Sequence, residues 1–554
     1  MQKSFLLDKP FLSDRTYLFL FSLLGLVYVA GLFVPLMDND SAHHAIIALR
    51  MHLTGDYVSL YDYSQDYLDK PHLLFWLSAM SYKIFGVTSF AYKFPSLLFT
   101  IGGVYSVYRL GKKLYGEESG KLAALMIASA FAFILANNDV RMDAILTACI
   151  AFSTWQLVEM VDSRRWLPVA GAALGLALGF CTKGHIAVFT PGLACLFYML
   201  SKKSMKVWLD VRWLLVLVLF AILIIPEVYA YYLQFNLHPE KVVRGKDHLN
   251  GVKFILLGQS VERFSGEMGD VGKNDRFFFF HSFAWAFAPW SFIAFIAFVN
   301  SLKNIFRNGI LWMTHGVFAV MIILISLSDF KLPHYLNILF PLTALFAASF
   351  FIRKKEDSKW VRVFFILQLI VSGLILVASA LANGWIFPVH SFLIITGTVI
   401  LLAVVLYFFK SAAWTNAQKA VLIPVATMVL LFFLLNTNFY PQLLQYQGGN
   451  TLSELVKGKV NADDIYFEPN SYSPSFNYYM STLRRPVTDS VLKSGKKIWV
   501  FTDKAHYASA DSAYHFKGKI FDVKRYWITR LNYKFLNPST REAQCTRFYL
   551  AEVN

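Results

Sequence analysis

Apolar residues recur along the chain in blocks of about 17–22, and short charged stretches separate the blocks. A helix needs roughly 20 apolar residues to cross the hydrocarbon core of a bilayer, so each block predicts a membrane span. The first block, near 17–36, follows Lys3, Lys9 and Arg15 without a small-residue cleavage site behind it, which favours a retained helix over a cleaved signal peptide. Further spans are predicted near 88–108, 122–136, 144–161, 167–181, 185–200, 213–232, 281–300, 311–327, 334–352, 363–383, 389–409 and 420–438. The pattern therefore predicts a bundle of about 13 transmembrane helices.

Basic residues gather in every second loop between these blocks. They are Arg109, Lys112, Lys113 and Lys121; Arg164 and Arg165; Lys202, Lys203, Lys206 and Arg212; Lys303 and Arg307; Arg353, Lys354, Lys355, Lys359 and Arg362; and Lys410 and Lys419. Lys and Arg close to helix ends stay in the cytoplasm, so these loops and the N-terminus are expected inside. An odd number of spans then places everything after Tyr440 on the outer side.

Composition agrees with a membrane protein. Of the 554 residues, 56% are apolar and only 16% are charged, whereas soluble domains carry about 25% charged residues. The net charge of +17 is largely explained by the basic loops, so we do not expect a nucleic-acid partner. Four cysteines are too few for a disulfide framework.

Two long outer loops and a polar tail complete the expected organisation. The loops cover 37–87 and 233–280, and the first holds two amphipathic pieces, 42–53 and 72–85, that suit the membrane interface. The tail has a short helical pattern at 452–457 and strand-like runs at 464–468, 497–502, 515–529 and 546–553. We therefore expect a mainly α, polytopic membrane helical bundle at 1–439 and a small extracytoplasmic α+β domain at 440–554.

Ionisable residues stand at six places on the predicted outer side, where insertion into a membrane would not favour them. They are Asp38-Asn39-Asp40, Tyr67-Leu68-Asp69-Lys70-Pro71-His72, Asn137-Asn138-Asp139-Val140-Arg141-Met142-Asp143, Thr182-Lys183-Gly184, Glu262-Arg263-Phe264 and Ser328-Asp329-Phe330-Lys331-Leu332-Pro333-His334-Tyr335. Cations can hold a phosphate or diphosphate, and a carboxylate can take a proton from an attacking group. Such a set suits an enzyme with a charged, membrane-embedded substrate. The alternative interpretation is a series of ordinary solvated loops.

The order and spacing of these motifs resemble the polyprenyl-phosphate-dependent glycosyltransferases of the C-type fold. The resemblance is to the bacterial branch around 4-amino-4-deoxy-L-arabinose transferase and the protein O-mannosyltransferases, and it covers roughly residues 17–350. The segments that carry it are the acidic pair before Gly55-Asp56-Tyr57, Tyr67-Leu68-Asp69-Lys70-Pro71, Arg141-Met142-Asp143, Thr182-Lys183-Gly184, Glu262-Arg263-Phe264, and Lys331-Leu332-Pro333-His334-Tyr335 leading to Pro341.

The resemblance implies a catalytic base in the first outer loop. The family has an Asp-Glu pair there, and its aspartate corresponds to Asp40, which Ser41 follows in place of the glutamate. Asp38 is a possible substitute, or alternatively a cap of the helix near 42–53. Asp69 and Lys70 match a family acid-lysine pair whose lysine contacts the donor phosphate, although a lysine before a proline also suits an interfacial, snorkelling position.

The remaining motifs supply the other expected site residues. Asp143 is a second catalytic candidate that positions the acceptor or the base, or else an acid favoured by a helix N-terminus. Lys70, Arg263, Lys331 and Lys183 are expected to bind the donor phosphate, while supporting roles are expected for Asp38, Asp69, Arg141, Glu262, His334 and Tyr335.

No metal ligand is assigned from the sequence. Some relatives bind a divalent ion through a first-loop acid and histidines in the second long loop, where this chain has four phenylalanines after Arg276. The adjacent His43 and His44 diverge on a helix and are poorly placed to share one ion. A required cofactor is therefore not expected, and a divalent metal remains possible.

Together these features lead to the hypothesis of an inverting hexosyl- or pentosyltransferase in a bacterial inner membrane. Its donor would be a sugar on polyprenyl phosphate (undecaprenyl phosphate), and its acceptor lipid A, another glycan or a protein at the outer face. Two alternatives stay open: a glycolipid or polysaccharide transporter without transfer chemistry, and a receptor or scaffold that acts through its tail. A transporter should carry charges to the membrane midplane between two similar halves, whereas the motifs here cluster at one face.

Overall fold

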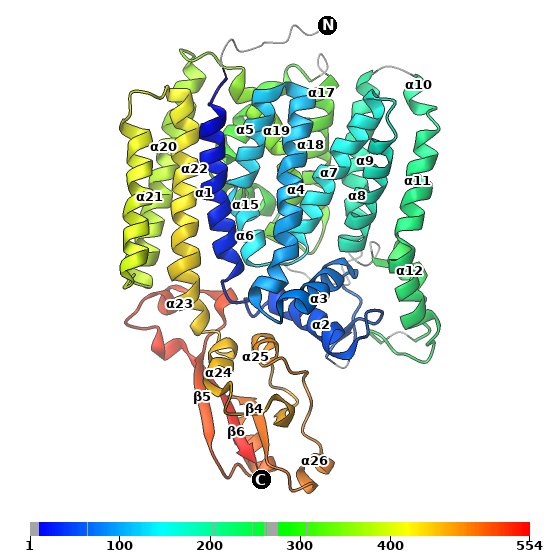
Figure 1. Ribbon diagram of the computed structural model, residues 1–554, viewed down its shortest axis with the longest axis vertical. Coiled ribbons are helices and arrows are strands. Elements are labelled where there is room, and N and C mark those ends of the chain that lie inside the picture. The colour runs from blue at the N-terminus through cyan, green and yellow to red at the C-terminus, as the bar shows by residue number, and fades with distance from the viewer. Residues whose placement is uncertain are drawn as a thin grey trace.

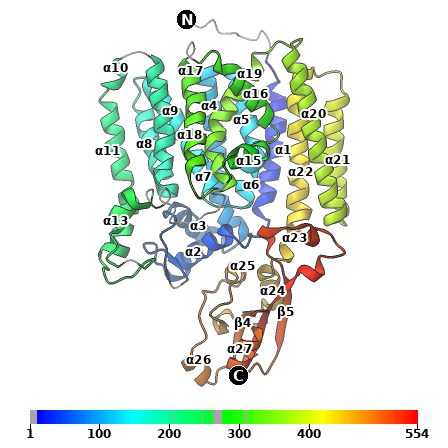
Figure 2. The same cartoon turned by 180° about the vertical axis from the view of Figure 1, so that it is seen from behind.

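The computed structural model describes residues 10–63, 65–202, 205–245, 247–259, 262, 275–305 and 309–553. Long helices run side by side in one layer, and a smaller layer of short helices, loops and a sheet covers one end of them (Figure 1). The C-terminus lies at the far tip of this smaller layer, away from the described start of the chain. The opposite view shows the same two layers (Figure 2).

The first part of the bundle precedes the second long loop. Its helices are α1 (Asp14–Leu32), α4 (Ser89–Tyr115), α5 (Glu117–Ala128), α6 (Phe131–Asn138), α7 (Asp143–Asp162), α8 (Leu167–Lys183), α9 (Ile186–Lys202), α10 (Met205–Trp208), α11 (Arg212–Leu223) and α12 (Ile225–Tyr231). The pairs α5–α6 and α11–α12 are bent by 52° and 42°. Pro226 stands in the first turn of α12, where its missing N–H costs no helical hydrogen bond.

The second part follows that loop. It contains α15 (Phe278–Ala286), α16 (Ser291–Leu302), α17 (Gly309–Leu311), the π-helical turn η3 (Trp312–Gly316), α18 (Val317–Leu327), the 3₁₀ turn η4 (Pro333–Leu339), α19 (Phe340–Ile352), α20 (Lys359–Ala380), α21 (Phe392–Lys410), α22 (Asn416–Leu434) and α23 (Tyr440–Gln445). Short π-helical segments, η1 (Tyr232–Asn236), η2 (Phe254–Gly258), η5 (Leu381–Ile386) and η6 (Leu435–Phe439), extend several helices, and α13 (Gly251–Lys253) precedes η2.

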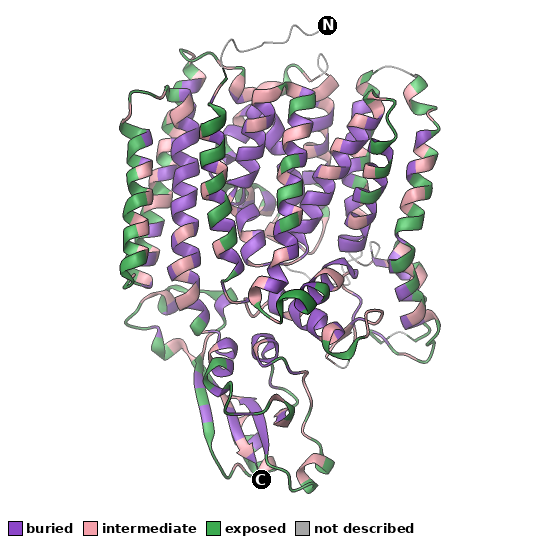
Figure 3. Cartoon of the chain, viewed as in Figure 1, coloured by how far each residue is buried: buried purple, intermediate pink, exposed green. Residues whose placement is uncertain are grey.

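Among the described residues, seven helices are long and apolar enough to cross a membrane, and nine when each bent pair counts as one span. The expectation of a mainly helical, multi-span membrane protein is thereby confirmed. Burial differs strongly between helices: buried residues fill α7 and α22, whereas α21 is exposed along most of its length (Figure 3). An apolar helix with so little protein around it is suited to contact with lipid.

A buried lysine ties two of the helices together. Lys93, in α4, is fully buried and donates hydrogen bonds to the carbonyl oxygens of Gly31 (3.1 Å) and Val34 (2.7 Å) at the end of α1. The last carbonyl groups of a helix have no partner within the helix, so this ammonium group caps α1. The cap fixes the point at which the chain leaves α1 for the first outer loop.

The first outer loop folds into two helices beneath the bundle. α2 (Asp40–Thr54) and α3 (Leu73–Phe85) confirm the two helices expected at 42–53 and 72–85, and the short strands β1 (Tyr61–Asp62) and β2 (Gln65–Asp66) lie between them. His72 joins this loop to α12: its Nδ1 atom lies 2.9 Å from the Glu227 carboxylate, and its Nε2 atom lies 2.8 Å from the carbonyl oxygen of Val58. Both side chains of the His72–Glu227 pair are almost fully buried.

The tail forms a four-stranded sheet in the order β3-β4-β6-β5. β3 (Ile465–Phe467) runs parallel to β4 (Ile498–Asp503), while β6 (Thr546–Val553) pairs antiparallel with β4 and with β5 (Ile520–Arg525). The strands lie in the four runs expected from their patterns. The tail's helices are α24 (Gly449–Val456), α25 (Pro474–Tyr479), α26 (Asp489–Lys493), α27 (Tyr507–Tyr514) and α28 (Tyr533–Leu536), with 3₁₀ turns η7 (Ala462–Asp464), η8 (Ile528–Arg530) and η9 (Glu542–Gln544).

Helix α25 joins the tail to the first outer loop. The Asp38 carboxylate accepts hydrogen bonds from the Ser475 N–H (2.9 Å) and the Ser473 hydroxyl (3.3 Å). Tyr479 accepts a hydrogen bond from the Leu36 N–H at 2.7 Å, and Tyr478 donates one to a backbone carbonyl just before α4. The tail is thus bonded to the segment that leads into α2.

Candidate active site

Arg141 is the centre of a polar network at the end of the bundle that faces α2 and α3. It lies between α6 and α7, and its guanidinium group is 2.9 Å from the carboxylate of Asp139 and 3.2 Å from that of Asp40. A third contact, 3.5 Å, joins it to the Nδ1 atom of His334. Burial disfavours the charged form, but the charges of Asp139, Asp40 and Asp143 outweigh it and raise the pKa of Arg141. One cation therefore connects three separate parts of the chain.

A buried ion pair lies beside Arg141. The Lys183 ammonium group, at the end of α8, is 2.8 Å from the carboxylate of Asp143, the first residue of α7. The two side chains are only 7% and 4% exposed. His334 approaches the other carboxylate oxygen of Asp143 at 3.8 Å, and the Lys183 ammonium lies 4.7 Å from the centre of the Tyr335 ring. The start of α7 thus holds a carboxylate and a cation in fixed relation.

Asp40 is the more accessible acid of the network. It opens α2, and its side chain is 53% exposed, although Arg141 contacts it. The preceding residue, Asn39, caps the helix by accepting from the Ser41 N–H at 2.8 Å and donates to the Asp139 carboxylate at 3.2 Å. The cap fixes the start of α2, and Arg141 contacts the Asp40 carboxylate while this side chain stays accessible to solvent.

His44 and Tyr67 link the network to the second half of the first loop. The Tyr67 hydroxyl lies 3.3 Å from the Nε2 atom of the buried His44. Burial, followed by the charges of His43, Lys70 and Arg141, lowers the pKa of His44. Burial and the nearby charges of Asp69 and Asp40 raise the pKa of Tyr67. The positive charges of Lys70 and Arg141 therefore both disfavour protonation of His44.

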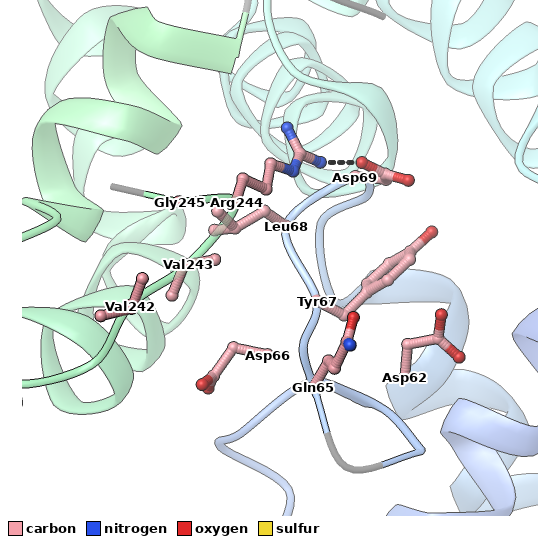
Figure 4. Close-up of a pocket in the computed structure, with 10 residues that line it drawn as sticks. All are labelled: Asp62, Gln65, Asp66, Tyr67, Leu68, Asp69, Val242, Val243, Arg244 and Gly245. Carbon is pink, nitrogen blue, oxygen red and sulfur yellow. Dashed lines mark hydrogen bonds and ion pairs between the residues drawn. The ribbon is translucent and has the colours of Figure 1, made fainter. Parts of the chain in front are cut away.

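A pocket of about 580 Å³ opens next to this part of the loop. One wall is formed by Asp62 and residues 65–69, and the other by the segment from Val242 to Gly245 (Figure 4). Arg244 reaches across the pocket to the Asp69 carboxylate and lies 2.8 Å from the carboxylate of Glu262. Arg244 therefore joins the two long outer loops.

The structure brings together most, but not all, of the residues expected at the site. Asp40, Arg141, Asp143, Lys183, His334 and Tyr335 form the network, and Asp69 and Glu262 meet at Arg244. The charge of Lys70 contributes to the lowered pKa of His44. Asp38 points to α25 in the tail, so it is not placed to substitute for Asp40. Lys331 is buried and donates to the carbonyl oxygen of Asp275 at 3.3 Å. Arg263 lies outside the described residues.

Two members of the site were missed. Asp139 stands in the same sequence motif as Arg141 and Asp143. Its position two residues before Arg141 could have indicated that the two side chains lie close together. Arg244 lies in an outer loop without a motif, and its partner Asp69 is 175 residues away. Only the fold shows that these two side chains meet.

Metal-binding side chains do not converge in the described part of the chain, where no group of three or more His, Cys, Asp or Glu residues is placed to hold an ion. The two adjacent histidines have separate polar partners, although their ring centres lie only 5.8 Å apart with the ring planes at 27°. His43 lies 2.9 Å from Asp62, whereas His44 contacts Tyr67.

Comparison with known proteins points to one class. Residues 69–230 match a family model described as dolichyl-phosphate-mannose-protein mannosyltransferase. An undecaprenyl phosphate-α-4-amino-4-deoxy-L-arabinose arabinosyl transferase from Pseudomonas fluorescens is 28% identical over 57% of this chain and 55% of the relative. One from Pseudomonas aeruginosa is also 28% identical, over 48% and 47%. The chain thus spans about half the length of the curated relatives it matches.

The fold agrees over nearly the whole chain. The crystal structure of ArnT from Cupriavidus metallidurans bound to undecaprenyl phosphate superimposes with a TM-score of 0.73 at 16% identity, covering 98% of both chains. An oligosaccharyltransferase from Archaeoglobus fulgidus gives a TM-score of 0.51 at 11% identity over 92% of this chain and 74% of its own. The fold is that of the C-type glycosyltransferases. The resemblance to the branch of the aminoarabinose transferases and protein mannosyltransferases is confirmed.

Proposed function

We propose that this protein is an inverting glycosyltransferase that moves a sugar from a polyprenyl-phosphate carrier to an acceptor at the outer face of a bacterial inner membrane. The observation that supports this most is the Arg141 network, which collects an accessible carboxylate and several cations at one end of a helical bundle. The matched relatives are named as transferases that use undecaprenyl phosphate, which favours transfer over transport.

In the proposed reaction Asp40 takes the proton of an acceptor hydroxyl group, or contacts an anionic acceptor oxygen directly. The acceptor oxygen forms a bond to the anomeric carbon while the bond from that carbon to the phosphate oxygen breaks. Because attack comes from the side opposite the phosphate, a single displacement inverts the anomeric centre. The exposed face of Asp40 leaves room for the acceptor, and Arg141 holds the carboxylate in position.

The leaving polyprenyl phosphate keeps the bonding electrons and so gains negative charge, which nearby cations stabilise. Lys70 is the lysine nearest in sequence to the pocket wall at Asp69, and we assign it to this phosphate together with Arg141. Lys331 and Arg263 are proposed as further contacts. Lys183 is paired with Asp143, so we propose that this pair mainly positions His334 and the start of α7.

The membrane orientation is part of the proposal. The positive-inside pattern places the N-terminus in the cytoplasm, and the site, the two long loops and the tail from 440 onward on the outer side. We infer 13 passes by adding α4, α8, α9 and the segment α15–α16 to the nine apolar spans. α4 is not one of the nine apolar spans, because its basic residues Lys93, Arg109, Lys112 and Lys113 lower its mean hydropathy. Its 27 residues are nevertheless long enough to span about 40 Å.

Lipid A, another glycan and a protein are the proposed acceptors. We propose that the reaction requires no metal ion, because protein cations would stabilise the leaving phosphate in its place. The tail is proposed as an extracytoplasmic α+β domain.

The test is the variant Asp40→Asn in the full-length protein, supplied with purified polyprenyl-phosphate-linked sugars and each acceptor class. Loss of a general base should lower the transfer rate by about 100-fold to 10,000-fold without changing the folded structure. Asp56→Asn is a matched control, since Asp56 lies in the same loop and its carboxylate accepts hydrogen bonds from the nearby Val58 and Ser59 N–H groups. Near-normal transfer by Asp40→Asn would refute the assignment of the base.

A further inference from the structure

A second polar cavity lies at the opposite end of the bundle from the candidate active site. It has a volume of about 440 Å³ and is bounded by the ends of α4, α16 and α19, the start of α20, and the segment α17–η3. α19 and the turn before it link the two regions: His334 stands in the network near Arg141, whereas Phe346 and Phe350 line this cavity. The 20 residues Pro333–Ile352 span about 30 Å, so the two regions are on opposite sides of the bundle (Figure 2).

Among the described residues, three basic side chains and no carboxylate line this cavity. Lys303 follows α16, and Arg353 and Lys354 follow α19. Within the described part of the chain, no carboxylate oxygen lies within 4 Å of any of these three cationic groups. Burial and then the charges of Lys303 and Arg353 lower the pKa of Lys354, as expected for cations that crowd one another without a counter-charge.

Aromatic rings contact two of these three cations, Arg353 and Lys354. The Lys354 ammonium lies 4.0 Å from the centre of the Phe350 ring and 6.0 Å from that of Trp360. The Arg353 guanidinium lies 5.5 Å from the Tyr115 ring. A cation–π contact orients a cation but leaves its full charge available to an anion. The arrangement is therefore prepared for a ligand that brings negative charge.

The remaining lining supplies neutral hydrogen-bonding groups. Asn300, Ser301, Asn304 and Ser349 line the cavity beside the three cations. His315 lines it as well and is buried against the Phe346 ring at 4.7 Å, and its Nε2 atom has no hydrogen-bond partner among the described residues. Basic groups with amide and hydroxyl donors match the oxygens of a phosphate group, and a volume of about 300–1,000 Å³ is usual for a ligand site.

We propose that this cavity binds a phosphate-bearing anion. The phosphate has two possible sources with the same chemistry: the headgroup of an anionic phospholipid in the adjacent leaflet, or a free phosphate or phosphorylated solute. Basic pockets between helices at a membrane surface recognise lipid headgroups, and Trp360 at the cavity edge has the amphipathic ring that suits this depth. The site is separate from the proposed transfer reaction and does not depend on it.

The experiment compares both sources on the purified full-length protein. Binding of phosphatidylglycerol, with phosphatidylcholine as the neutral control, is measured by native mass spectrometry and by the shift in unfolding temperature. In a second arm, inorganic phosphate is titrated against chloride at constant ionic strength. Removing a charge-assisted contact should weaken binding about tenfold in the variants Lys303→Gln and Lys354→Gln. Lys410→Gln, at an exposed lysine on the same side of the bundle, should bind as the unaltered protein does.

Each outcome decides the proposal. Selective phosphatidylglycerol binding that falls in the two pocket variants and recovers in Lys303→Arg and Lys354→Arg supports a lipid ligand. The same pattern with inorganic phosphate supports a soluble ligand. The proposal is overturned if neither ligand binds above its control, or if the pocket variants and Lys410→Gln bind equally well. Single variants with unchanged unfolding temperature in the absence of ligand exclude loss of folding as the cause.

Discussion

The buried ion pair between Asp143 and Lys183 makes a sharp prediction about stability and activity. At 2.8 Å, and with an effective dielectric constant of about 20, the attraction between the two charges is about 6 kcal/mol. Desolvation of both groups offsets much of it, but a single substitution leaves the other charge buried without its partner. Lys183→Met and Asp143→Asn should therefore each lower the free energy of unfolding by about 3–5 kcal/mol.

The double variant separates the structural role from the functional one. With both charges gone, Asp143→Asn/Lys183→Met should recover most of the lost stability, because no uncompensated charge remains. Transfer activity should stay low, since His334 and the start of α7 lose the carboxylate that orients them. Unfolding temperatures in detergent and transfer rates would be measured for the four proteins. The reasoning would be refuted if the losses in unfolding free energy were additive, so that the double variant was the least stable of the four proteins. The two buried charges would then not stabilise each other.

Three further predictions concern other contacts. Burial raises the pKa of Asp38 from 3.8 to about 6. Its contribution to stability is therefore complete below pH 3.8 and is lost as the pH rises through 6. Asp38→Asn should remove this loss of about 3 kcal/mol, so that the unfolding temperature changes less between pH 3 and 7.5. An unchanged pH slope would refute this. Glu227→Gln should make the first outer loop more accessible to proteases, because it removes the buried charge that faces His72. Equal cleavage rates for the variant and the unaltered protein would contradict a role of Glu227 in holding the loop. Chelation with EDTA should leave the transfer rate unchanged within twofold, and a loss restored by one divalent ion would argue for a metal site.

The hydrophobic pattern predicted the apolar helices, the two helices of the first outer loop and the four tail strands, but not the short helices α25 to α28 of the tail. Apolar blocks, two amphipathic helices and alternating strand patterns are local properties, so α2, α3 and the four tail strands lie where the sequence places them. The motif from Asn137 to Asp143 also predicted a polar cluster at the start of α7, because its charged residues stand within one helical turn of one another.

Contacts between distant segments could not be predicted in the same way. Asp38 and Asp40 are two residues apart, yet one faces the tail and the other faces Arg141. This difference depends on the docking of α25, which no pattern around Asp38 records. Likewise, the contact of Arg244 with Asp69 depends on how two long loops meet. The hydrogen bond from Lys93 of α4 to the Gly31 carbonyl of α1 depends on how two helices pack.

The docking of α25 has a consequence for shortened forms of the protein. Removing the chain beyond Tyr440 would strip Asp38 of both its serine donors and the Leu36 amide of its tyrosine acceptor. Gln447, which donates to the Leu36 carbonyl and accepts from the Asp38 amide, would be lost as well. The freed segment leads directly into α2, so a truncated protein would also be perturbed at the start of its first outer loop. Its inactivity would therefore say nothing about whether the missing part handles acceptors.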